Sequence, residues 1–469
     1  MYGMIFESFF GRVNYDLKDR YFFTANFRRD GNSALASGKK YGNFGGASAG
    51  WLISKEDFFL RSRIATVVND LKVTASWGRV GNGNLSNAYS SLSLYSSSLY
   101  GTAPTWTLSQ VGSTQLSWET SEQTNIGLTA SFLKRRLQLE AAYFNNDVNG
   151  LILNTPLSPS QGIPGNSILA NVGSMYNRGV ELGLNARIIS NAKFSWEVSV
   201  NYTNIRNKVT ALANGGDIIG YSGSTLNNTN ITRVGYSAGS LYGAVSAGVN
   251  PANGQRIFIN AKGEKVQYSF AVPSGGSNWT YLNGDKANAI TGTDYKPLGN
   301  ALPKWYGGFG NTFRYGAFDA NVLFTFAGGN YIMNGTKTTL RDQIFFNNST
   351  DMLRRWTKAG QVTDIPRLVY NDRISNGTQF SISENVEKGD FLRLQNLAIG
   401  YQLPVDLIKR LQLSTLRVYA QATNLFLLTG YKGSDPEIST NGNSNTTPGV
   451  EFNSIGMART FTLGINVGF

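Results

Sequence analysis

The last ten residues of the chain, 460–469, read TFTLGINVGF, and they decide the class of fold. Every second side chain is apolar up to the final residue, in the series Phe461, Leu463, Ile465, Val467 and Phe469. Such alternation places these side chains on one face of a β-strand. Terminal residues of a domain usually fray unless something holds them. The pattern therefore predicts a strand that is held in a sheet to its last residue.

The same alternation recurs along the whole chain. It predicts thirteen strands, approximately at residues 5–16, 19–30, 42–53, 69–80, 117–133, 136–149, 175–190, 193–209, 303–315, 317–330, 390–402, 413–426 and 458–469. These runs span about ten residues or more, the length that a tilted strand needs to cross a bilayer, whereas strands of soluble proteins average about five or six residues.

Alternation alone fits two environments. A soluble sandwich buries the apolar face of each strand, whereas a membrane barrel turns that face to lipid and the polar face to a watery lumen. The connections favour the barrel, because short and long connections alternate strictly. Tight turns and the medium links 54–68 and 403–412 fall on one side, and the long connections fall on the other, at 31–41, 81–116, 150–174, 210–302, 331–389 and 427–457. Short turns at one rim and long extracellular loops at the other are typical of outer-membrane barrels.

Composition agrees with an all-β chain and excludes several kinds of chemistry. The 469 residues include 53 Gly, 27 Phe and 23 Tyr, and only 15% are charged. With no Cys and no His, the chain has no thiol nucleophile, no Ser-His-Asp triad and almost no possible zinc site. The net charge of +13 is dispersed, which does not favour nucleic acid as a partner. We therefore expect no enzyme activity, no cofactor and no metal.

Tryptophan placement also fits a membrane barrel. Five of the eight Trp fall near the ends of predicted strands, where aromatic girdles meet the membrane interfaces, namely Trp51, Trp77, Trp118, Trp196 and Trp305.

An odd strand count raises a question about the start of the chain. Single-chain bacterial barrels have an even number of strands, and the opening residues MYGMIFESFF lack the basic region and cleavage site of a signal peptide. We therefore expect residues 1–469 to be the C-terminal part of a longer barrel protein.

Several stretches resemble the SusC/RagA-like branch of TonB-dependent outer-membrane transporters. They include GRVNYDLKDRYFFTANFRRDGNS near the start, NVGSMYNRGVELGLN in the middle, and DFLRLQNLAIGYQLP, NLFLLTGYKGSDPE and TFTLGINVGF near the end. The resemblance implies a 22-stranded plugged barrel, of which about thirteen C-terminal strands are present, within a single domain that here lacks the N-terminal plug, the TonB box and the signal peptide.

The resemblance also implies a function and partners. It implies nutrient import, as uptake of oligosaccharides or oligopeptides, across the outer membrane of a Gram-negative bacterium. The partners would be a SusD-like surface lipoprotein, the TonB complex through the missing N-terminal region, outer-membrane lipid and the oligosaccharide or peptide ligand. The terminal Phe469 resembles the assembly signal that the barrel-insertion machinery reads.

Residues that could contact a substrate are sought among the loop aromatics, because flat rings with a polar handle stack on sugars or peptides. The candidates are Tyr89, Tyr95, Tyr100, Trp106, Trp279 and Tyr281. Packing between loops or against a lid would use the same rings. Four charged residues are expected to face the lumen, where they would shape the path or hold a plug: Glu181, Arg187, Glu197 and Arg417.

Two pairs of acidic residues could in principle serve as glycosidase carboxylates, namely Glu384 with Glu387 and Asp435 with Glu437. We interpret both pairs as solvated loop carboxylates. The second pair lies in the motif GSDPE, where we expect Gly433 and Pro436 to set a turn.

Two alternatives to an importer stay open. A surface β-protein that binds glycans without transport would remain soluble without detergent, and a passive pore would conduct ions in a planar bilayer.

Overall fold

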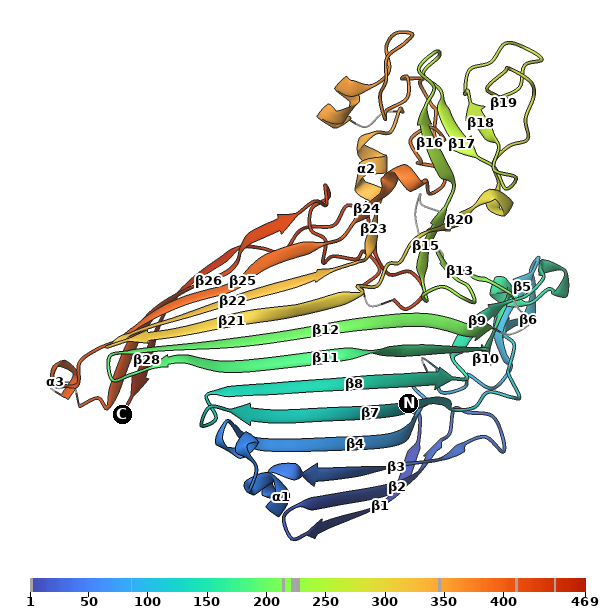
Figure 1. The fold of residues 1–469 in the computed structure, drawn as a ribbon. Helices are drawn as coiled ribbons and strands as arrows, with labels where there is room; N and C mark the ends of the chain where they lie inside the picture. Colours follow the sequence, from blue (N-terminus) through green and yellow to red (C-terminus); the bar gives the residue numbers. More distant parts are fainter. Residues whose placement is uncertain are drawn as a thin grey trace.

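The computed structural model describes residues 3–85, 87–212, 216–220, 228–344, 347–409, 412–442 and 444–469. Thirteen strands form one antiparallel sheet in the order of the sequence (Figure 1). They are β1 (Phe6–Leu17), β2 (Tyr21–Asn32), β3 (Tyr41–Leu52), β4 (Val68–Asn82), β7 (Glu119–Phe132), β8 (Leu137–Asn149), β11 (Gly173–Ser190), β12 (Phe194–Leu212), β21 (Trp305–Tyr315), β22 (Phe318–Gly328), β25 (Phe391–Gln402), β26 (Thr415–Thr429) and β28 (Thr460–Gly468). Each lies within three residues of its predicted bounds, so the all-β prediction is confirmed.

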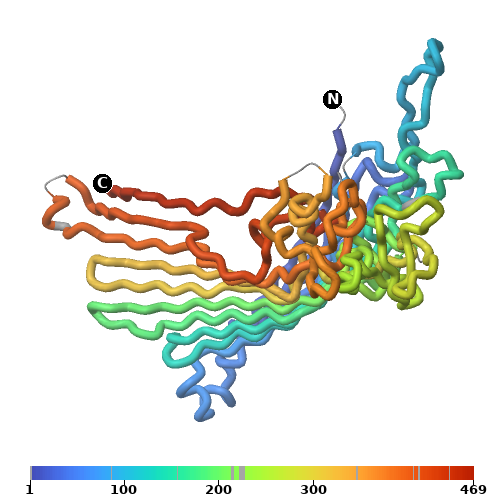
Figure 2. Tube along the Cα trace, turned by 90° about the horizontal axis from the view of Figure 1, so that it is seen from above, coloured from blue at the N-terminus to red at the C-terminus, as the bar shows by residue number. Residues whose placement is uncertain are grey.

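The sheet is curved and open. Seen from above, it bends into a trough whose two edges are the first and last strands (Figure 2). Within the described residues, β1 pairs only with β2, and β28 pairs only with β26. A sheet with this curvature forms part of the wall of a barrel.

The two rims of the sheet differ as predicted. The turn rim holds the connections 18–20, 53–67, 133–136, 191–193, 316–317 and 403–414, and the loop rim holds 33–40, 83–118, 150–172, 213–304, 329–390 and 430–459. The C-terminus lies at the turn rim (Figure 1). The helices of the turn rim are η1 (Ile53–Lys55), α1 (Asp57–Leu60), η2 (Arg63–Thr66) and α3 (Val405–Ile408).

Antiparallel register gives the sheet one apolar face and one polar face. Residues that lie opposite each other on neighbouring strands share a face, so one apolar row runs through Trp196, Phe313, Ala320, Ile399, Ala420 and Leu463. A row on the other face runs through Thr129, Glu140, Gly183, Asn201, Gly308 and Thr325.

The apolar face is uncovered. Ile399 is 51% exposed and Leu463 is 85% exposed, and no second sheet of the described residues packs on this face. In water such a face would be an aggregation site, whereas in a bilayer it meets lipid. The three clusters of buried apolar side chains instead lie at the loop rim.

Aromatic rings on the apolar face gather beside the turn rim. Tyr21 stacks on Trp51 with ring centroids 6.4 Å apart, and Trp196 stacks on Phe313 at 5.8 Å. Phe318 and Tyr401 form a third pair at 4.7 Å. This band is what an aromatic girdle at a membrane interface requires. Of the other Trp expected near strand ends, Trp305 begins β21, Trp118 directly precedes β7, and Trp77 lies further inside β4.

The loops contain short strands that the alternation pattern did not predict. They are β5 (Leu94–Tyr100), β6 (Ala103–Gln110), β9 (Ile152–Pro156), β10 (Ser167–Asn171), β13 (Ile218–Gly220), β14 (Asn230–Thr232), β15 (Ser240–Gly243), β16 (Val245–Val249), β17 (Arg256–Ile259), β18 (Lys265–Tyr268), β19 (Trp279–Tyr281), β20 (Lys296–Gly299), β23 (Tyr331–Asn334), β24 (Val386–Lys388) and β27 (Val450–Glu451). The helices of the loop rim are η3 (Pro159–Gln161), η4 (Pro164–Asn166), η6 (Gly292–Asp294), α2 (Gly335–Leu340), η7 (Thr350–Arg354) and η8 (Ser383–Asn385).

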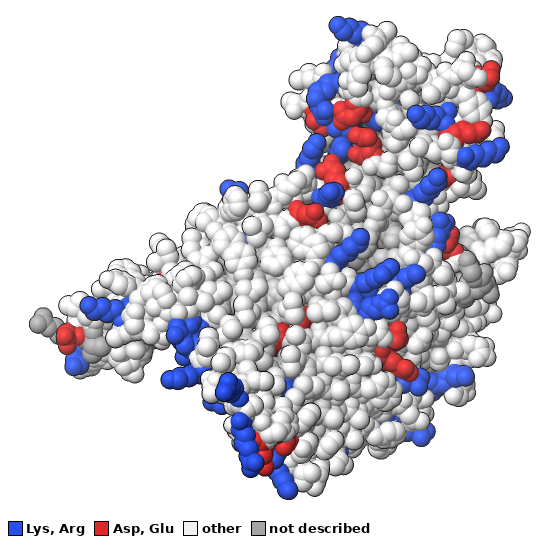
Figure 3. Space-filling view, viewed as in Figure 1, with Lys and Arg blue, Asp and Glu red and all other residues white. Residues whose placement is uncertain are grey.

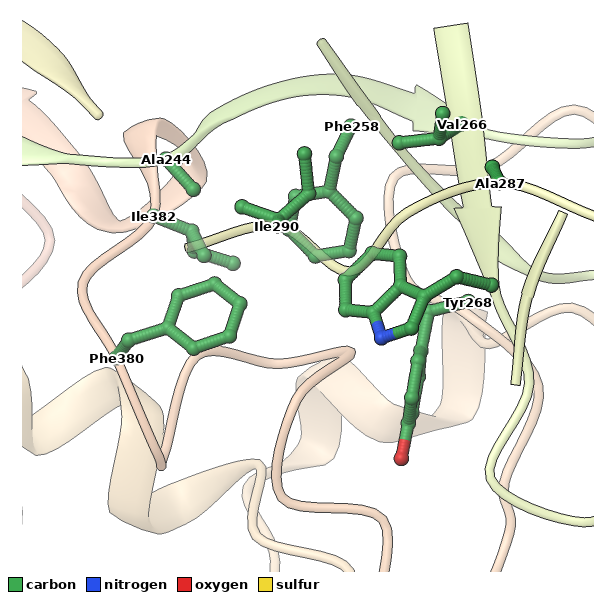
Figure 4. Close-up of a cluster of buried hydrophobic side chains, with 9 residues drawn as sticks. Ala244, Phe258, Val266, Tyr268, Ala287, Ile290, Phe380 and Ile382 are labelled. Carbon is green, nitrogen blue, oxygen red and sulfur yellow. The ribbon is translucent and has the colours of Figure 1, made fainter. Parts of the chain in front are cut away.

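The described residues of the connections 213–304 and 329–390 form a folded unit beyond the loop rim, which we call the lobe (Figure 1). Its core contains Phe258, Tyr268, Trp279, Phe380 and Ile382 (Figure 4). Charged side chains of both signs gather on its surface (Figure 3). The lobe therefore has the buried core and polar surface of a small water-exposed domain, unlike the sheet.

Among the described residues, no helix has the length and apolar content needed to span a bilayer.

Candidate functional site

The four charged residues expected in the lumen all lie on the polar face of the sheet. Arg187 pairs with Glu197 across β11 and β12, with Nε 3.5 Å from Oε1. Arg417 donates from Nε to Oδ1 of Asp319 at 2.9 Å. Glu181 lines a cavity of about 470 Å³ together with Glu140 and Asn201. The sheet thus carries fixed charge on the face that a barrel turns inward.

A second cavity of the polar face is basic. It has a volume of about 240 Å³ and is lined by Arg135, Arg136 and Arg187 beside Glu197. Arg136 is held in place because its guanidinium donates to the carbonyl oxygens of Arg187 at 3.2 Å and Ile188 at 2.6 Å. This cavity lies next to the turn rim, at the β7–β8 turn.

A buried ion-pair cluster joins the sheet to the last long loop. Arg393 of β25 is 2% exposed, and its guanidinium donates to Asp435 at 2.6 Å and to Glu437 at 2.5 Å. The interpretation of these carboxylates as solvated is therefore wrong, because Asp435 is itself buried and both serve as partners of Arg393. Arg393 lies in one of the stretches that resemble the family, and the motif GSDPE lies in another. The sequence alone does not indicate that the two stretches are in contact.

The other acidic pair is also bound within the protein. Glu387 accepts from the Lys337 ammonium at 3.0 Å, and Glu384 lies 3.8 Å from the fully buried Arg256. Burial lowers the pKa of Arg256 to about 10, while Glu384 opposes this shift. The Arg256 guanidinium also donates a hydrogen bond from Nε to the carbonyl oxygen of Ser375 at 2.9 Å. These carboxylates hold the lobe together, so reading them as solvated is wrong as well.

Three of the predicted loop aromatics stand on a projecting hairpin formed by β5 and β6 (Figures 1 and 2). Tyr95 is opposite Leu108, and Trp106 is opposite Ser97, so both rings lie on one face of the hairpin. Tyr100 lies at its tip and is 85% exposed. Tyr89 precedes the hairpin. That these rings contact a ligand stays a prediction.

The other two predicted aromatics lie on β19 in the lobe and differ in their surroundings. Trp279 is buried in the lobe core, where its ring lies 4.9 Å from Tyr268 and 5.5 Å from Phe258. It also borders a cavity of about 390 Å³ with Tyr295 and Phe380. Burial raises the pKa of Tyr295 to about 12.

Tyr281, two residues further along β19, opens onto a different cleft. This surface cleft has a volume of about 320 Å³ and is lined by Tyr281, Glu264, Asn288 and Asp294, among others. The negative charge of Glu264 raises the pKa of the Tyr281 hydroxyl. A hydrogen bond from Asn260 is the main cause that lowers the pKa of Glu264, so this carboxylate is ionised at neutral pH.

Comparison with known proteins defines the class. Residues 2–425 match the family model of the TonB dependent receptor-like β-barrel, and the chain belongs to this family. The predicted resemblance to its SusC/RagA-like branch is also confirmed. TonB-dependent receptor P3 of Formosa agariphila is 33% identical over 475 residues, which cover 98% of this chain and 45% of that receptor.

Two further comparisons place the chain within the branch. TonB-dependent receptor SusC of Bacteroides thetaiotaomicron is 28% identical over 487 residues, which cover 98% of this chain and 43% of SusC. The solved structure of the RagAB peptide transporter superimposes with a TM-score of 0.79 at 25% identity, over 99% of this chain and 48% of that one. The chain thus spans about half the length of the relatives that it matches.

Proposed function

We propose that residues 1–469 form part of the wall of an outer-membrane barrel that imports nutrients. The observation that carries the proposal is the two-faced sheet, whose apolar side chains are uncovered and whose polar face holds charged residues. A wall of this kind separates lipid from a water-filled path. Membership of the TonB-dependent receptor family supports import as the use of that path.

The complete transporter would have the same barrel architecture as other members of the family. The thirteen strands form an open sheet, and unpaired strand edges are costly in lipid. Further strands are therefore needed to close the wall, and a 22-stranded barrel with an internal plug fits the family. We place the assembly in the outer membrane of a Gram-negative bacterium, with the loop rim outside the cell.

The partners follow from the same family. A SusD-like surface lipoprotein would cover the loop rim, and the TonB complex would deliver energy to the complete transporter. The cargo would be an oligosaccharide or an oligopeptide, the latter supported by the description of RagAB as a peptide transporter. The terminal Phe469, which is 95% exposed at the turn rim, would serve in barrel assembly. We propose no enzymatic role, since the named relatives are receptors and a transporter.

Uptake by the native bacterium tests the proposal. Cells with and without the gene are given fluorescent oligosaccharides and oligopeptides, and label that reaches the periplasm is measured with and without a protonophore. We expect deletion of the gene to abolish uptake of one of these classes and the protonophore to abolish it equally, because TonB-driven import requires the proton gradient. Re-expression of the gene should restore uptake.

The same experiment separates the two alternatives. Uptake that persists with the protonophore would indicate a passive pore. Label that binds to the cell surface without reaching the periplasm would indicate a surface binding protein. Either result would contradict the import proposal.

A further inference from the structure

The cleft beside Tyr281 lies on the lobe, among residues of the β17–β18 connection, β19 and the segment that leads into η6. One wall is the β17–β18 connection with Asn260, Lys262 and Glu264, and another is the segment 288–294. The Tyr281 ring packs against the lobe core and also lines the cleft. A ring held in this way presents a fixed surface to a ligand, which lowers the entropy lost on binding.

The carboxylates of the cleft are oriented by hydrogen bonds from the lobe itself. Oε2 of Glu264 accepts from the Asn260 amide at 2.9 Å and from the Tyr281 hydroxyl at 3.2 Å. Asp294 accepts from the backbone N–H of Ala261 at 2.8 Å and from that of Thr291 at 2.9 Å. Each carboxylate oxygen can accept more than one hydrogen bond. Glu264 and Asp294 can therefore still accept hydrogen bonds from a ligand.

Two donors of the cleft remain available. Among the described residues, the side chains of Lys262 and Asn288 form no hydrogen bond or ion pair, and both residues are exposed. The cleft therefore offers donors and acceptors side by side around an aromatic ring. A hydroxyl group both donates and accepts, so a ligand with neighbouring hydroxyls satisfies both kinds of group at once.

The charge and the small apolar area of the cleft lining disfavour both anionic ligands and apolar peptide side chains. The lining contains one cation, Lys262, against the carboxylates of Glu264 and Asp294, and it contains no Arg. Two carboxylates against one Lys disfavour a sulfate, phosphate or carboxylate ligand by like-charge repulsion, and the cleft has no Arg fork to hold such a group in two hydrogen bonds. Its aliphatic lining consists of two Ala, at 261 and 289, so an apolar peptide side chain finds no deep hydrophobic pocket.

We propose that this cleft binds a segment of a neutral, polyhydroxylated chain, that is, an uncharged glycan. The inference rests on the proposed import function and names a class of cargo that the lobe would bind, at a site separate from the polar face of the sheet. The sugar ring stacks on Tyr281 through its apolar C–H face, as aromatic rings with a polar edge permit. Its hydroxyls donate to Glu264 and Asp294 and accept from Asn288 and Lys262.

Binding by the purified protein tests the inference. The protein is produced from its native gene and held in lipid nanodiscs, because sugar-based detergents would compete for the cleft. Saturation-transfer NMR is recorded with maltohexaose, cellohexaose, laminarihexaose, xylohexaose and mannohexaose. A sulfated carrageenan oligosaccharide and hexa-alanine serve as the charged and the peptide probes. We expect at least one neutral sugar to bind and neither of the other probes to compete with it.

Variants assign the binding to the cleft. Tyr281→Ala should weaken the neutral sugar about tenfold, the loss expected when one aromatic contact is removed. Tyr281→Phe keeps the ring and should stay within about threefold of the wild type, since one neutral hydrogen bond contributes little net free energy. Asn288→Ala should weaken binding by a similar threefold for the same reason. Tyr370→Ala, at an exposed lobe Tyr outside the lining, is the matched control and should bind as the wild type does.

Three results would overturn the inference: no neutral sugar binds, Tyr281→Ala binds as well as the wild type, or only the sulfated sugar or the peptide binds. Its failure is distinguishable from failure of the import proposal. If uptake depends on the gene and is abolished by the protonophore, but no binding depends on Tyr281, then the glycan site is refuted and the import proposal stands. If a neutral sugar binds in a Tyr281-dependent manner but no uptake is found, then the import proposal is refuted and the glycan site stands.

Discussion

Replacing Arg393 with methionine should destabilise the junction between β25 and the loop 430–459 by about 3–5 kcal/mol, the usual cost of removing one partner from a buried ion pair. The change leaves Asp435 and Glu437 without their cation, and Asp435 is only 3% exposed. Methionine keeps much of the volume of the arginine stem, so the loss is chiefly electrostatic. Hydrogen exchange followed by mass spectrometry should show faster exchange across 430–459 in protein made from its native gene.

An exposed ion pair provides the matched control for this substitution. Arg79 lies 3.6 Å from Glu122 on neighbouring strands, with both side chains at least 40% exposed. Exposed pairs contribute about 0–1 kcal/mol, so Arg79→Met should leave exchange nearly unchanged. Adding Asp435→Asn and Glu437→Gln to Arg393→Met should recover part of the loss, because no buried charge then remains unpaired. Equal effects of Arg393→Met and Arg79→Met would show that the cluster does not hold the loop.

Arginine on the apolar face of the sheet should be costly, whereas arginine at the next residue should not. Val200 lies on the apolar face of β12, four residues from Trp196 of the aromatic band and opposite Leu184 and Phe309. Val200→Arg should lower the free energy of unfolding in lipid by about 2–4 kcal/mol, the cost of a cation at the bilayer midplane. Denaturant titration of protein made from its native gene and reconstituted in liposomes measures this change.

Asn201 is the matched control because it points to the opposite face. It lines the cavity of about 470 Å³ on the polar face, where a long cation has room and meets water. Asn201→Arg should therefore change the free energy of unfolding by no more than about 0.5 kcal/mol. If Asn201→Arg cost more than Val200→Arg, the assignment of the two faces would be reversed.

The thirteen long strands could be predicted from the sequence because each carries its own signal. Alternation sustained over about nine or more residues is hard to produce by chance, and β12 shows it from Phe194 to Tyr202. The strict alternation of short and long connections then predicted which connections lie at the turn rim and which lie at the loop rim. The shortest strands of the loops carry no such signal, since β19 of the lobe has three residues and β27 of the loop 430–459 has two.

The parts of the candidate sites that sequence analysis missed depend on contacts between distant residues. Arg393 and Asp435 are 42 positions apart, and nothing in either motif reveals that the loop folds back onto β25. Trp279 and Tyr281 are two positions apart and read alike in sequence, but the first ring is buried in the lobe core and the second lines a cleft. Only tertiary packing separates these roles.

The central claim is that the apolar face of the sheet meets hydrocarbon and the polar face meets water. Nitroxide labels at Val198 and Ser199, in the protein reconstituted in bilayers, test it directly because these neighbours on β12 point to opposite faces. We expect oxygen dissolved in the lipid to relax the Val198 label more strongly, and a water-soluble nickel chelate to relax the Ser199 label more strongly. A Val198 label that responds to the nickel chelate and not to oxygen would contradict the account.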